Sequence, residues 1–290
     1  MANGPASHLR ESMRSLAKLA SNIAFYPLPL RVLLLRKILR HLKWLRFETR
    51  LQFDAVERPY YAFCIFHAAI LAQALGHRAM SIIEFGVAGG NGLVNVERHV
   101  EELSNELKMN FEVFGFDLEE GLPKPADYRD MPYMWAKGFY KMDRAALEKK
   151  LRISNLVIGD VAETSTSFFV KYAPAPIGCM LFDLDYYSST RDAFQIFHAD
   201  ARQFLPRVYC YFDDIASGGM RANNRYLGVL QAIEEFNASN SHRKIARISG
   251  LATSRAVPAS WNERVFVFHD FVHPQYCNFI GNSHQNLPLK

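Results

Sequence analysis

The sequence predicts an α/β protein built on a seven-stranded, mostly parallel sheet with helices on both faces. From residue 59 onward, apolar runs of strand length alternate with helical patterns. An apolar content of 49% spread along 290 residues favours one large core with additions. Two of the apolar runs end in aspartates, as expected for strands whose carboxyl ends border a binding site.

The expected elements follow one another in a regular order. A helix over residues 60–75 ends at Gly76, and SIIEFG is a strand that ends at Gly86. A glycine-rich turn then leads into a helix over about residues 92–108. Six further strands are expected at FEVFGF, NLVIG, IGCMLFD, RVYCYFD, RKIARIS and ERVFVFH. Further helices are expected over about residues 143–151, 163–172, 188–204 and 225–238.

Charge divides the chain into an extension and a body. Residues 1–58 hold 11 Lys/Arg and 4 Asp/Glu, net +7, whereas the remainder holds 23 and 25, net −2. We therefore expect a basic helical extension at residues 1–58, one large domain at 59–270 and a tail at 271–290. Because the body is not basic, the sequence argues against a nucleic-acid partner.

Cysteines and apolar runs indicate the compartment. Cys64, Cys179, Cys210 and Cys277 lie far apart, without a CxxC pair, so we expect reduced thiols and no metal bound by cysteine. No apolar run reaches the roughly 18 residues that a membrane span needs. We expect a cytoplasmic protein.

The N-terminal stretch LPLRVLLLRKILRHLKWLRFETR has a basic amphipathic pattern. The apolar stripe contains Leu35, Ile38, Leu42 and Leu45. Three interpretations stay open: residues 28–50 contact an anionic membrane surface, they pack on another subunit of a homo-oligomer, or they pack on the protein's own body.

Four aspartates follow two apolar runs that read as neighbouring buried strands. Asp183 and Asp185 end the first run, and Asp213 and Asp214 end the second. Carboxyl ends of parallel strands share one edge of a sheet, so four carboxylates meet there. They must bind a cation or take up protons. The sequence therefore predicts a divalent metal site.

A glycine-rich turn follows the first strand, in IIEFGVAGGNGL. The turn contains Glu84, Gly86, Ala88 and Gly90, so the backbone can turn tightly and approach a ligand closely. The dinucleotide fingerprint fits poorly, because Asn91 stands where the third glycine belongs. The pattern acid-x-Gly-x-small-x-Gly-x-Gly instead resembles the first motif of class I S-adenosylmethionine-dependent methyltransferases.

Acidic residues also end the next two strands. By this resemblance, Asp117 binds the ribose hydroxyls, since two acceptor oxygens match a vicinal diol. Asp160, together with Val161, contacts the adenine. The alternative for Asp117 and Asp160 is an ordinary helix N-cap.

A closer resemblance extends over about residues 60–240. The segments EFGVAGGNG, GFDLEEGLP, GDVAET, DLDYYSSTRDA and YFDD are similar to those of the macrocin O-methyltransferase family, which includes the novobiocin sugar O-methyltransferase. The resemblance implies that Asp183, Asp213 and Asp214 hold Mg²⁺ and that Asp185 is the general base. On an extended segment, Asp185 would face the same way as Asp183.

Residues 117–142 form a long segment without a regular pattern, rich in proline, glycine and aromatic residues. Its place after a strand, at the carboxyl edge, suits a lid over a bound ligand. Trp135 and Phe139 either cover the ligand or form a small satellite hydrophobic cluster.

These features favour an O-methyltransferase that uses S-adenosylmethionine and Mg²⁺ on a hydroxyl of a sugar, a glycan-linked group or another vicinal diol. One alternative is a non-catalytic, S-adenosylmethionine-binding or scaffolding protein of the same fold, although such a protein has no need of four mutually repelling carboxylates. An NAD-linked oxidoreductase lacks the required glycine. A nucleic-acid methyltransferase lacks the Asn/Asp-Pro-Pro-Tyr type segment, in whose place DLDYY stands.

Overall fold

The computed structural model describes residues 30–215 and 219–281. The chain divides into two compact units, residues 1–56 and residues 57–290. Residues 1–29 of the predicted extension and residues 282–290 of the predicted tail lie outside the described residues.

The larger unit is built on one seven-stranded sheet with the order β3-β2-β1-β4-β5-β7-β6. Neighbours from β3 to β5 pair in parallel, and β7 pairs antiparallel with both β5 and β6. This confirms the predicted Rossmann-like fold class. The strands are β1 (Ala79–Phe85), β2 (Asn110–Asp117), β3 (Ser154–Ile158), β4 (Ile177–Phe182), β5 (Phe204–Phe212), β6 (Arg243–Arg247) and β7 (Val265–Asp270).

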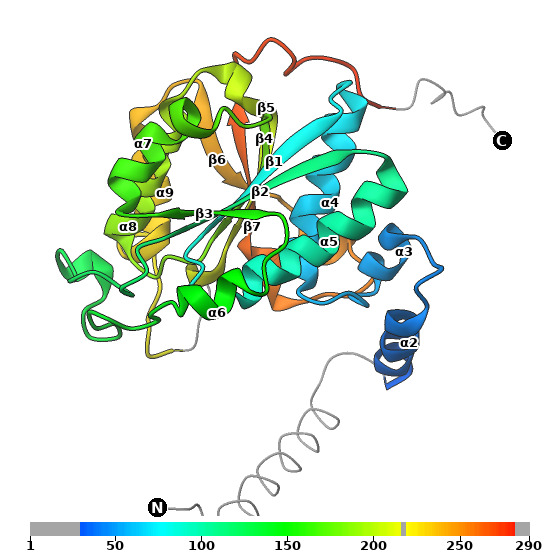
Figure 1. The fold of residues 1–290 in the computed structure, drawn as a ribbon, viewed down its shortest axis with the longest axis horizontal. Helices are drawn as coiled ribbons and strands as arrows, with labels where there is room; N and C mark the ends of the chain where they lie inside the picture. Colours follow the sequence, from blue (N-terminus) through cyan, green and yellow to red (C-terminus); the bar gives the residue numbers. More distant parts are fainter. Residues whose placement is uncertain (1–29, 216–218, 282–290) are drawn as a thin grey trace, which may run out of the picture. The chain divides into compact units, whose positions relative to one another are not determined.

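Helices cover both faces of this sheet (Figure 1). On one face, α4 (Pro59–Ala74) and α5 (Asn91–Leu107) pack on the strands, and on the other lie α7 (Val161–Tyr172), α8 (Tyr187–Ala193) and α9 (Gly228–Ser239). Two short helices, α6 (Arg144–Glu148) and α10 (Leu251–Ser254), complete the unit.

Aromatic rings form much of the core between the sheet and its helices. Phe85, Phe182 and Phe212 end β1, β4 and β5, and their rings stack in sequence at centroid distances of 5.0 and 4.6 Å. All six residues of β4 are buried, which is typical of a central strand covered on both faces. The packed core therefore fixes the strand ends from which the acidic side chains project.

One predicted helix is wrong in its extent. Instead of a single helix over residues 188–204, α8 ends at Ala193, and two 3₁₀ turns, Phe194–His198 and Ala201–Gln203, follow. Asp200 accepts a hydrogen bond from the backbone N–H of Arg202 at 2.9 Å, and this local cap competes with helix continuation. As a result, β5 begins three residues earlier than RVYCYFD predicts.

Glu97 on α5 is a buried carboxylate that fixes the start of β3. It accepts hydrogen bonds from the backbone N–H groups of Arg152, Ile153 and Ser154 at 2.8–3.0 Å, and from Ser154 Oγ at 2.7 Å. Burial acts to raise the pKa of Glu97, but these hydrogen bonds outweigh burial and leave the pKa below its ordinary value.

We expect Glu97→Gln to lower the free energy of unfolding by about 1–3 kcal/mol, because a neutral amide accepts these hydrogen bonds more weakly. The loss is expected at neutral pH and shrinks in acid, since the contribution of a carboxylate with a lowered pKa disappears as pH falls through that pKa. Urea unfolding at pH 7 and pH 4 measures it. Glu101→Gln, exposed on the same helix, is the control, and equal unfolding curves for the two variants would contradict the prediction.

In the smaller unit the structure describes α2 (Leu30–His41) and α3 (Phe47–Gln52). Arg36 Nε donates to the carbonyl of Asp54 at 2.7 Å, which ties α2 to the end of this unit. Of the predicted apolar stripe, Leu35 and Ile38 are exposed, and Leu39 is buried instead. The membrane and subunit contacts considered for residues 28–50 stay predictions, and residues 28 and 29 lie outside the described part.

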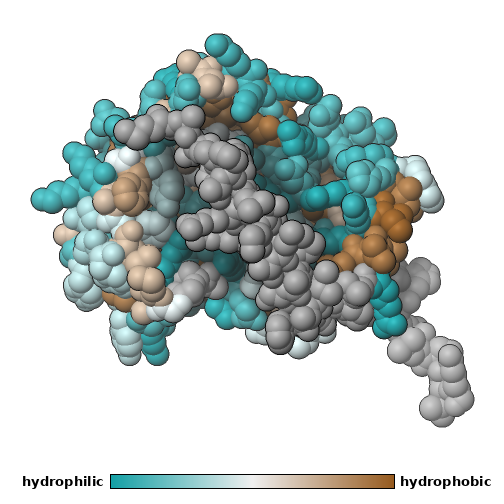
Figure 2. Space-filling model, turned by 90° about the horizontal axis from the view of Figure 1, so that it is seen from below, coloured by the Kyte–Doolittle hydropathy of each residue, from teal (hydrophilic) through white to brown (hydrophobic). Residues whose placement is uncertain are grey.

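Figure 2 shows the surface from below the view of Figure 1, and the residues coloured there are mostly hydrophilic, with separate apolar patches. Within residues 30–215 and 219–281, no helix combines the length and the apolar character that crossing a bilayer requires.

Candidate functional site

A cavity of about 510 Å³ lies at the carboxyl ends of the parallel strands. Parallel β-α units place their loops at this edge, which is where α/β folds bind ligands. Nine of the eleven predicted site residues line the cavity, and Glu84 and Gly90 are the two that do not. The nine are Gly86, Ala88, Asp117, Asp160, Val161, Asp183, Asp185, Asp213 and Asp214.

The glycine turn after β1 is held by close backbone packing. Gly86 has φ +85°, and a Cβ added there would lie 1.8 Å from the carbonyl oxygen of Asp183. Gly90 has φ +77° and precedes α5, where a Cβ would lie 2.1 Å from a methyl carbon of Leu147. The positive φ strains an L side chain at both positions, and at Gly86 the added Cβ would also meet backbone atoms. The turn therefore passes directly against the chain that carries the first aspartate of the acidic cluster.

Glu84 is buried beneath the turn. Its Oε1 accepts a hydrogen bond from the Tyr61 hydroxyl at 2.8 Å, and a Cβ at Gly92 would lie 1.8 Å from the same oxygen. Oε2 is buried and has no hydrogen-bond partner among the described residues. Burial raises the pKa of Glu84 to about 7, against the hydrogen bond from Tyr61 and the charge of Arg58. The carboxyl group thus supports the turn and keeps one oxygen for a further donor.

Asp117 and Asp160 stand at the ends of β2 and β3. Asp117 accepts from the backbone N–H of Ala88 at 2.8 Å and of Glu119 at 2.6 Å, so it ties the glycine turn to the second strand. Asp160 is the N-cap of α7 and accepts from the N–H of Ala162 at 2.8 Å. The N-cap alternative therefore describes Asp160, which lines the cavity as well.

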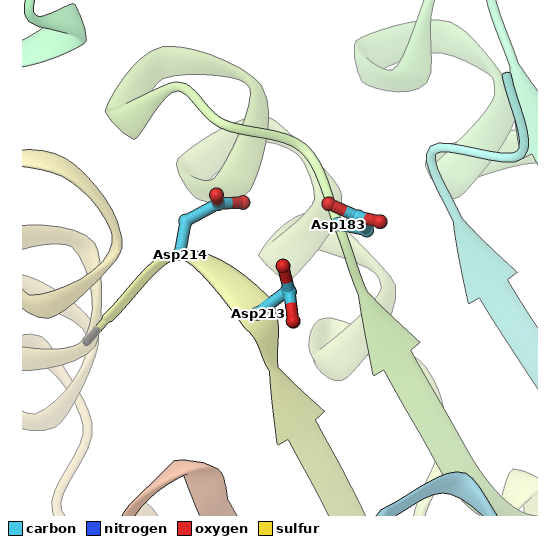
Figure 3. A group of neighbouring side chains, drawn as sticks. All are labelled: Asp183, Asp213 and Asp214. Atoms are coloured by element: carbon cyan, nitrogen blue, oxygen red, sulfur yellow. The ribbon is translucent and has the colours of Figure 1, made fainter. Parts of the chain in front are cut away.

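Three carboxylates converge at the ends of β4 and β5 (Figure 3). Asp183, Asp213 and Asp214 each offer one oxygen, and these oxygens lie within 4.8 Å of one another. Two ligands on opposite sides of Mg²⁺, each about 2.1 Å away, are about 4.2 Å apart. Adjacent ligands of Mg²⁺ lie about 3.0 Å apart, so the three carboxylates could hold a small, hard cation once their side chains draw closer together.

Neighbouring groups orient two of these carboxylates. Asp213 Oδ1 accepts from the Tyr211 hydroxyl at 3.0 Å and from Arg264 Nη1 at 2.8 Å. Asp214 Oδ2 accepts from the backbone N–H of Asp185 at 2.9 Å, and Asp214 Oδ1 accepts from Arg221 Nη1 at 3.2 Å. Such outer partners fix the direction of metal ligands.

The charges in this cluster repel one another. Burial, followed by the charges of Asp214 and Asp213, raises the pKa of Asp183 well above its ordinary value. Burial, followed by Asp214 and Asp183, raises the pKa of Asp185 to about 9. Burial and mutual repulsion thus favour the protonated forms of these groups, and a cation among them would favour their ionised forms.

The expected extended segment from Asp183 to Asp185 is wrong. Asp185 has φ +58°, in the left-handed region, and Tyr186 N–H donates to the carbonyl of Leu184. This turn places the N–H of Asp185 against Asp214, and aspartate tolerates the left-handed conformation better than most residues. The Asp185 side chain is buried and lines the cavity without belonging to the group of three.

The lid segment, residues 117–142, is anchored at its middle. Asp130 is buried and accepts from the backbone N–H of Ala126 and from both the N–H and Oγ of Ser188, all at 2.7–2.8 Å. Arg129 lies over the ring of Tyr187 at 4.1 Å. The segment is therefore fixed to the start of α8.

Trp135 belongs to a satellite hydrophobic cluster with Met131 and Tyr186. It does not line the cavity, and neither does Phe139, which is exposed. Tyr140 is the aromatic residue of the lid segment that does line it.

Sequence reasoning missed several residues around the site. Tyr61, Tyr211 and Arg264 orient predicted carboxylates, and Arg221 lines the cavity beside Asp214. Tyr61 and Arg264 lie 23 and 51 positions from their partners, so no local pattern marks them. A cation seven residues after paired aspartates is the one local signal that was available for Arg221.

No protein-family model matches this chain, and no curated protein matches it. Similar solved structures are methyltransferases. The calicheamicin methyltransferase CalS11 is 18% identical over 94% of this chain and 95% of its own, with a TM-score of 0.49. The O-methyltransferase NovP is 14% identical over 83% and 98%, with a TM-score of 0.49. MycE from the mycinamycin pathway, in complex with Mg, SAH and mycinamycin VI, is 12% identical over 72% and 48%, with a TM-score of 0.38. At this level of similarity, conclusions about function depend on the residues of this chain.

Proposed function

We propose that this protein is an O-methyltransferase that uses S-adenosylmethionine and Mg²⁺ and acts on a hydroxyl of a sugar or of another vicinal diol. One observation carries the proposal: a single cavity brings the glycine turn, the acidic ends of β2 and β3, and the three-carboxylate cluster together. Such an arrangement would put a nucleoside-type site next to a cation site, as methyl transfer to a metal-bound hydroxyl requires.

The residues of the nucleoside side fit S-adenosylmethionine. Gly86 lets the backbone approach the ligand, and Asp117 offers acceptor oxygens of the kind that bind a ribose diol. Asp160 and Val161 line the same cavity and would border the adenine. The unpaired, buried Oε2 of Glu84 suits a donor reached through the turn, such as the ligand's ammonium group or a water. When bound, the cofactor supplies a methyl group on a sulfonium centre, and the S–C bond breaks with its electron pair left on sulfur.

The residues of the metal side suit a hydroxyl acceptor. Asp183, Asp213 and Asp214 would hold Mg²⁺, which makes a bound hydroxyl more acidic. Hydrogen bonds from Tyr211 and Arg264 hold the carboxylate of Asp213 in its orientation. Asp185 would take the acceptor's proton as the oxygen–methyl bond forms, because its buried carboxyl borders the same cavity without being one of the three ligands.

Metal removal is the direct test of this function. With S-adenosylmethionine labelled in its methyl group and a panel of sugars, glycosides and small diols, we expect mass spectrometry to detect an acceptor that gains one methyl group. EDTA is expected to lower the rate by about 10²-fold or more, and excess Mg²⁺ to restore it. Equal rates in EDTA and in Mg²⁺ would contradict the metal role. Calorimetric binding of S-adenosylmethionine with no turnover of any acceptor would favour the non-catalytic alternative.

The acceptor class follows from the same site. A vicinal diol can offer two adjacent oxygens to one cation, so sugars and glycan-linked groups are the first acceptors to test. The segments quoted for the macrocin O-methyltransferase family include both the glycine turn and the acidic cluster, and we propose membership of that family on the strength of these residues. We propose no nucleic-acid acceptor.

A further inference from the structure

Arg221 stands between the acidic cluster and the lid segment. Its guanidinium Nη1 donates to Asp214 Oδ1 at 3.2 Å, and its Cζ lies 4.4 Å from the centroid of the Trp135 ring. The carbonyl of Arg221 accepts from the Tyr133 hydroxyl at 3.0 Å. One residue therefore contacts a proposed metal ligand and, through two separate contacts, the lid segment.

Arg221 contacts a carboxylate that a metal would use. Asp214 Oδ2 accepts from the backbone N–H of Asp185 and Asp214 Oδ1 accepts from Arg221 Nη1, so a cation bound by Asp214 would meet a donor already placed on either oxygen. Asp214 is almost fully buried, and Arg221 is partly buried beside it. A guanidinium and a divalent cation on one carboxylate repel each other at short range. Metal and Arg221 therefore compete for Asp214.

The contact between Arg221 and Trp135 connects this competition with the lid segment. Trp135 is packed in the satellite cluster, and its buried Nε1 has no hydrogen-bond partner among the described residues. The guanidinium over the indole face is a cation–π contact, which depends on where the arginine lies. A shift of Arg221 away from Asp214 therefore changes the surroundings of the indole.

We propose that Arg221 is a positioning residue that couples metal loading to the lid segment: it neutralises Asp214 in the metal-free protein, and the arriving cation displaces it and alters its stacking on Trp135. This inference rests on the proposed function, because it takes the acidic cluster to be a metal site. Arg221 needs no contact with the reacting atoms for this role.

Titration of the full-length protein with MgCl₂ tests the inference by calorimetry and by tryptophan emission. In the wild type we expect Mg²⁺ to change the emission, and in Trp135→Phe we expect the same Mg²⁺ affinity without that change. In Arg221→Gln we expect about tenfold tighter Mg²⁺ binding, since a competing charge is gone, and no emission change from Trp135. Arg225→Gln is the matched control, because Arg225 follows in the same loop and pairs with Glu234 at the surface.

The outcomes separate the two proposals. Mg²⁺ binding without an emission change in the wild type overturns the coupling alone, as does weaker Mg²⁺ binding in Arg221→Gln, which is what a purely structural arginine would give. If no variant binds Mg²⁺, the metal site of the proposed function is refuted, and the coupling with it.

Discussion

Replacing Asp214 by asparagine is expected to lower the rate of the proposed methyl transfer by about 10³-fold or more, because the variant removes one charged ligand of the proposed cation. Asp183→Asn is expected to behave in the same way. Affinity for S-adenosylmethionine should stay within about threefold in both variants, since neither side chain belongs to the nucleoside side of the cavity. Initial rates in saturating Mg²⁺ and calorimetry with the cofactor measure the two quantities.

Asp183→Asn also has an expected effect on stability. Because burial and the neighbouring carboxylates raise the pKa of Asp183, its ionised form is unfavourable in the metal-free protein. A neutral side chain of the same shape relieves that repulsion, so the melting temperature in EDTA should not fall. Asp200→Asn is the control, as Asp200 is an exposed cap that does not line the cavity. Activity within tenfold of the wild type in Asp214→Asn would refute the metal-ligand role.

Gly86→Ala is expected to lower the free energy of unfolding by about 3 kcal/mol or more and to abolish cofactor binding. Two causes add. The residue has φ +85°, which an L side chain adopts at a cost of about 1–2 kcal/mol. In addition, the new Cβ would lie 1.8 Å from the carbonyl oxygen of Asp183, and backbone atoms cannot rotate away as the end of a side chain can. Urea unfolding and calorimetry with S-adenosylmethionine measure the two effects.

The turn supplies its own control. Gly89 lies three residues further on, and a Cβ added there meets nothing within 4 Å. Gly89→Ala should therefore change stability by no more than about 0.5 kcal/mol. If Gly86→Ala and Gly89→Ala unfolded at the same urea concentration, the close packing of the turn against β4 would not be what holds the site.

The sequence was sufficient to predict those parts of the fold that depend on short, local patterns. Strand-length apolar runs ending in Glu84, Asp117 and Asp183 predicted the sheet and its acidic edge, because burial of parallel strands on both faces leaves a continuous apolar run. The succession of strands and helices along the chain followed from the alternation of their patterns.

The remaining features of the site depend on long-range contacts. The conformation of Asp185 depends on Asp214, 29 residues away, which accepts a hydrogen bond from its N–H and so favours a left-handed turn over an extended strand end. Trp135 packs against Tyr186, which a local pattern cannot indicate. The carboxylate of Asp213 is oriented by Arg264, which directly precedes β7. The two residues meet because β7 pairs antiparallel with β5.

The tight fit of Gly86 against Asp183 has a consequence for how this enzyme class can diversify. The N–H of Asp183 also donates to the carbonyl of Phe85 at 2.9 Å, so the two chain segments are joined on both sides of the contact. In the proposed function, the spacing between the methyl donor and the cation would thereby be set by the sheet. Substitutions in residues 118–142 would then change the choice of acceptor while the residues proposed for the transfer chemistry stay in place.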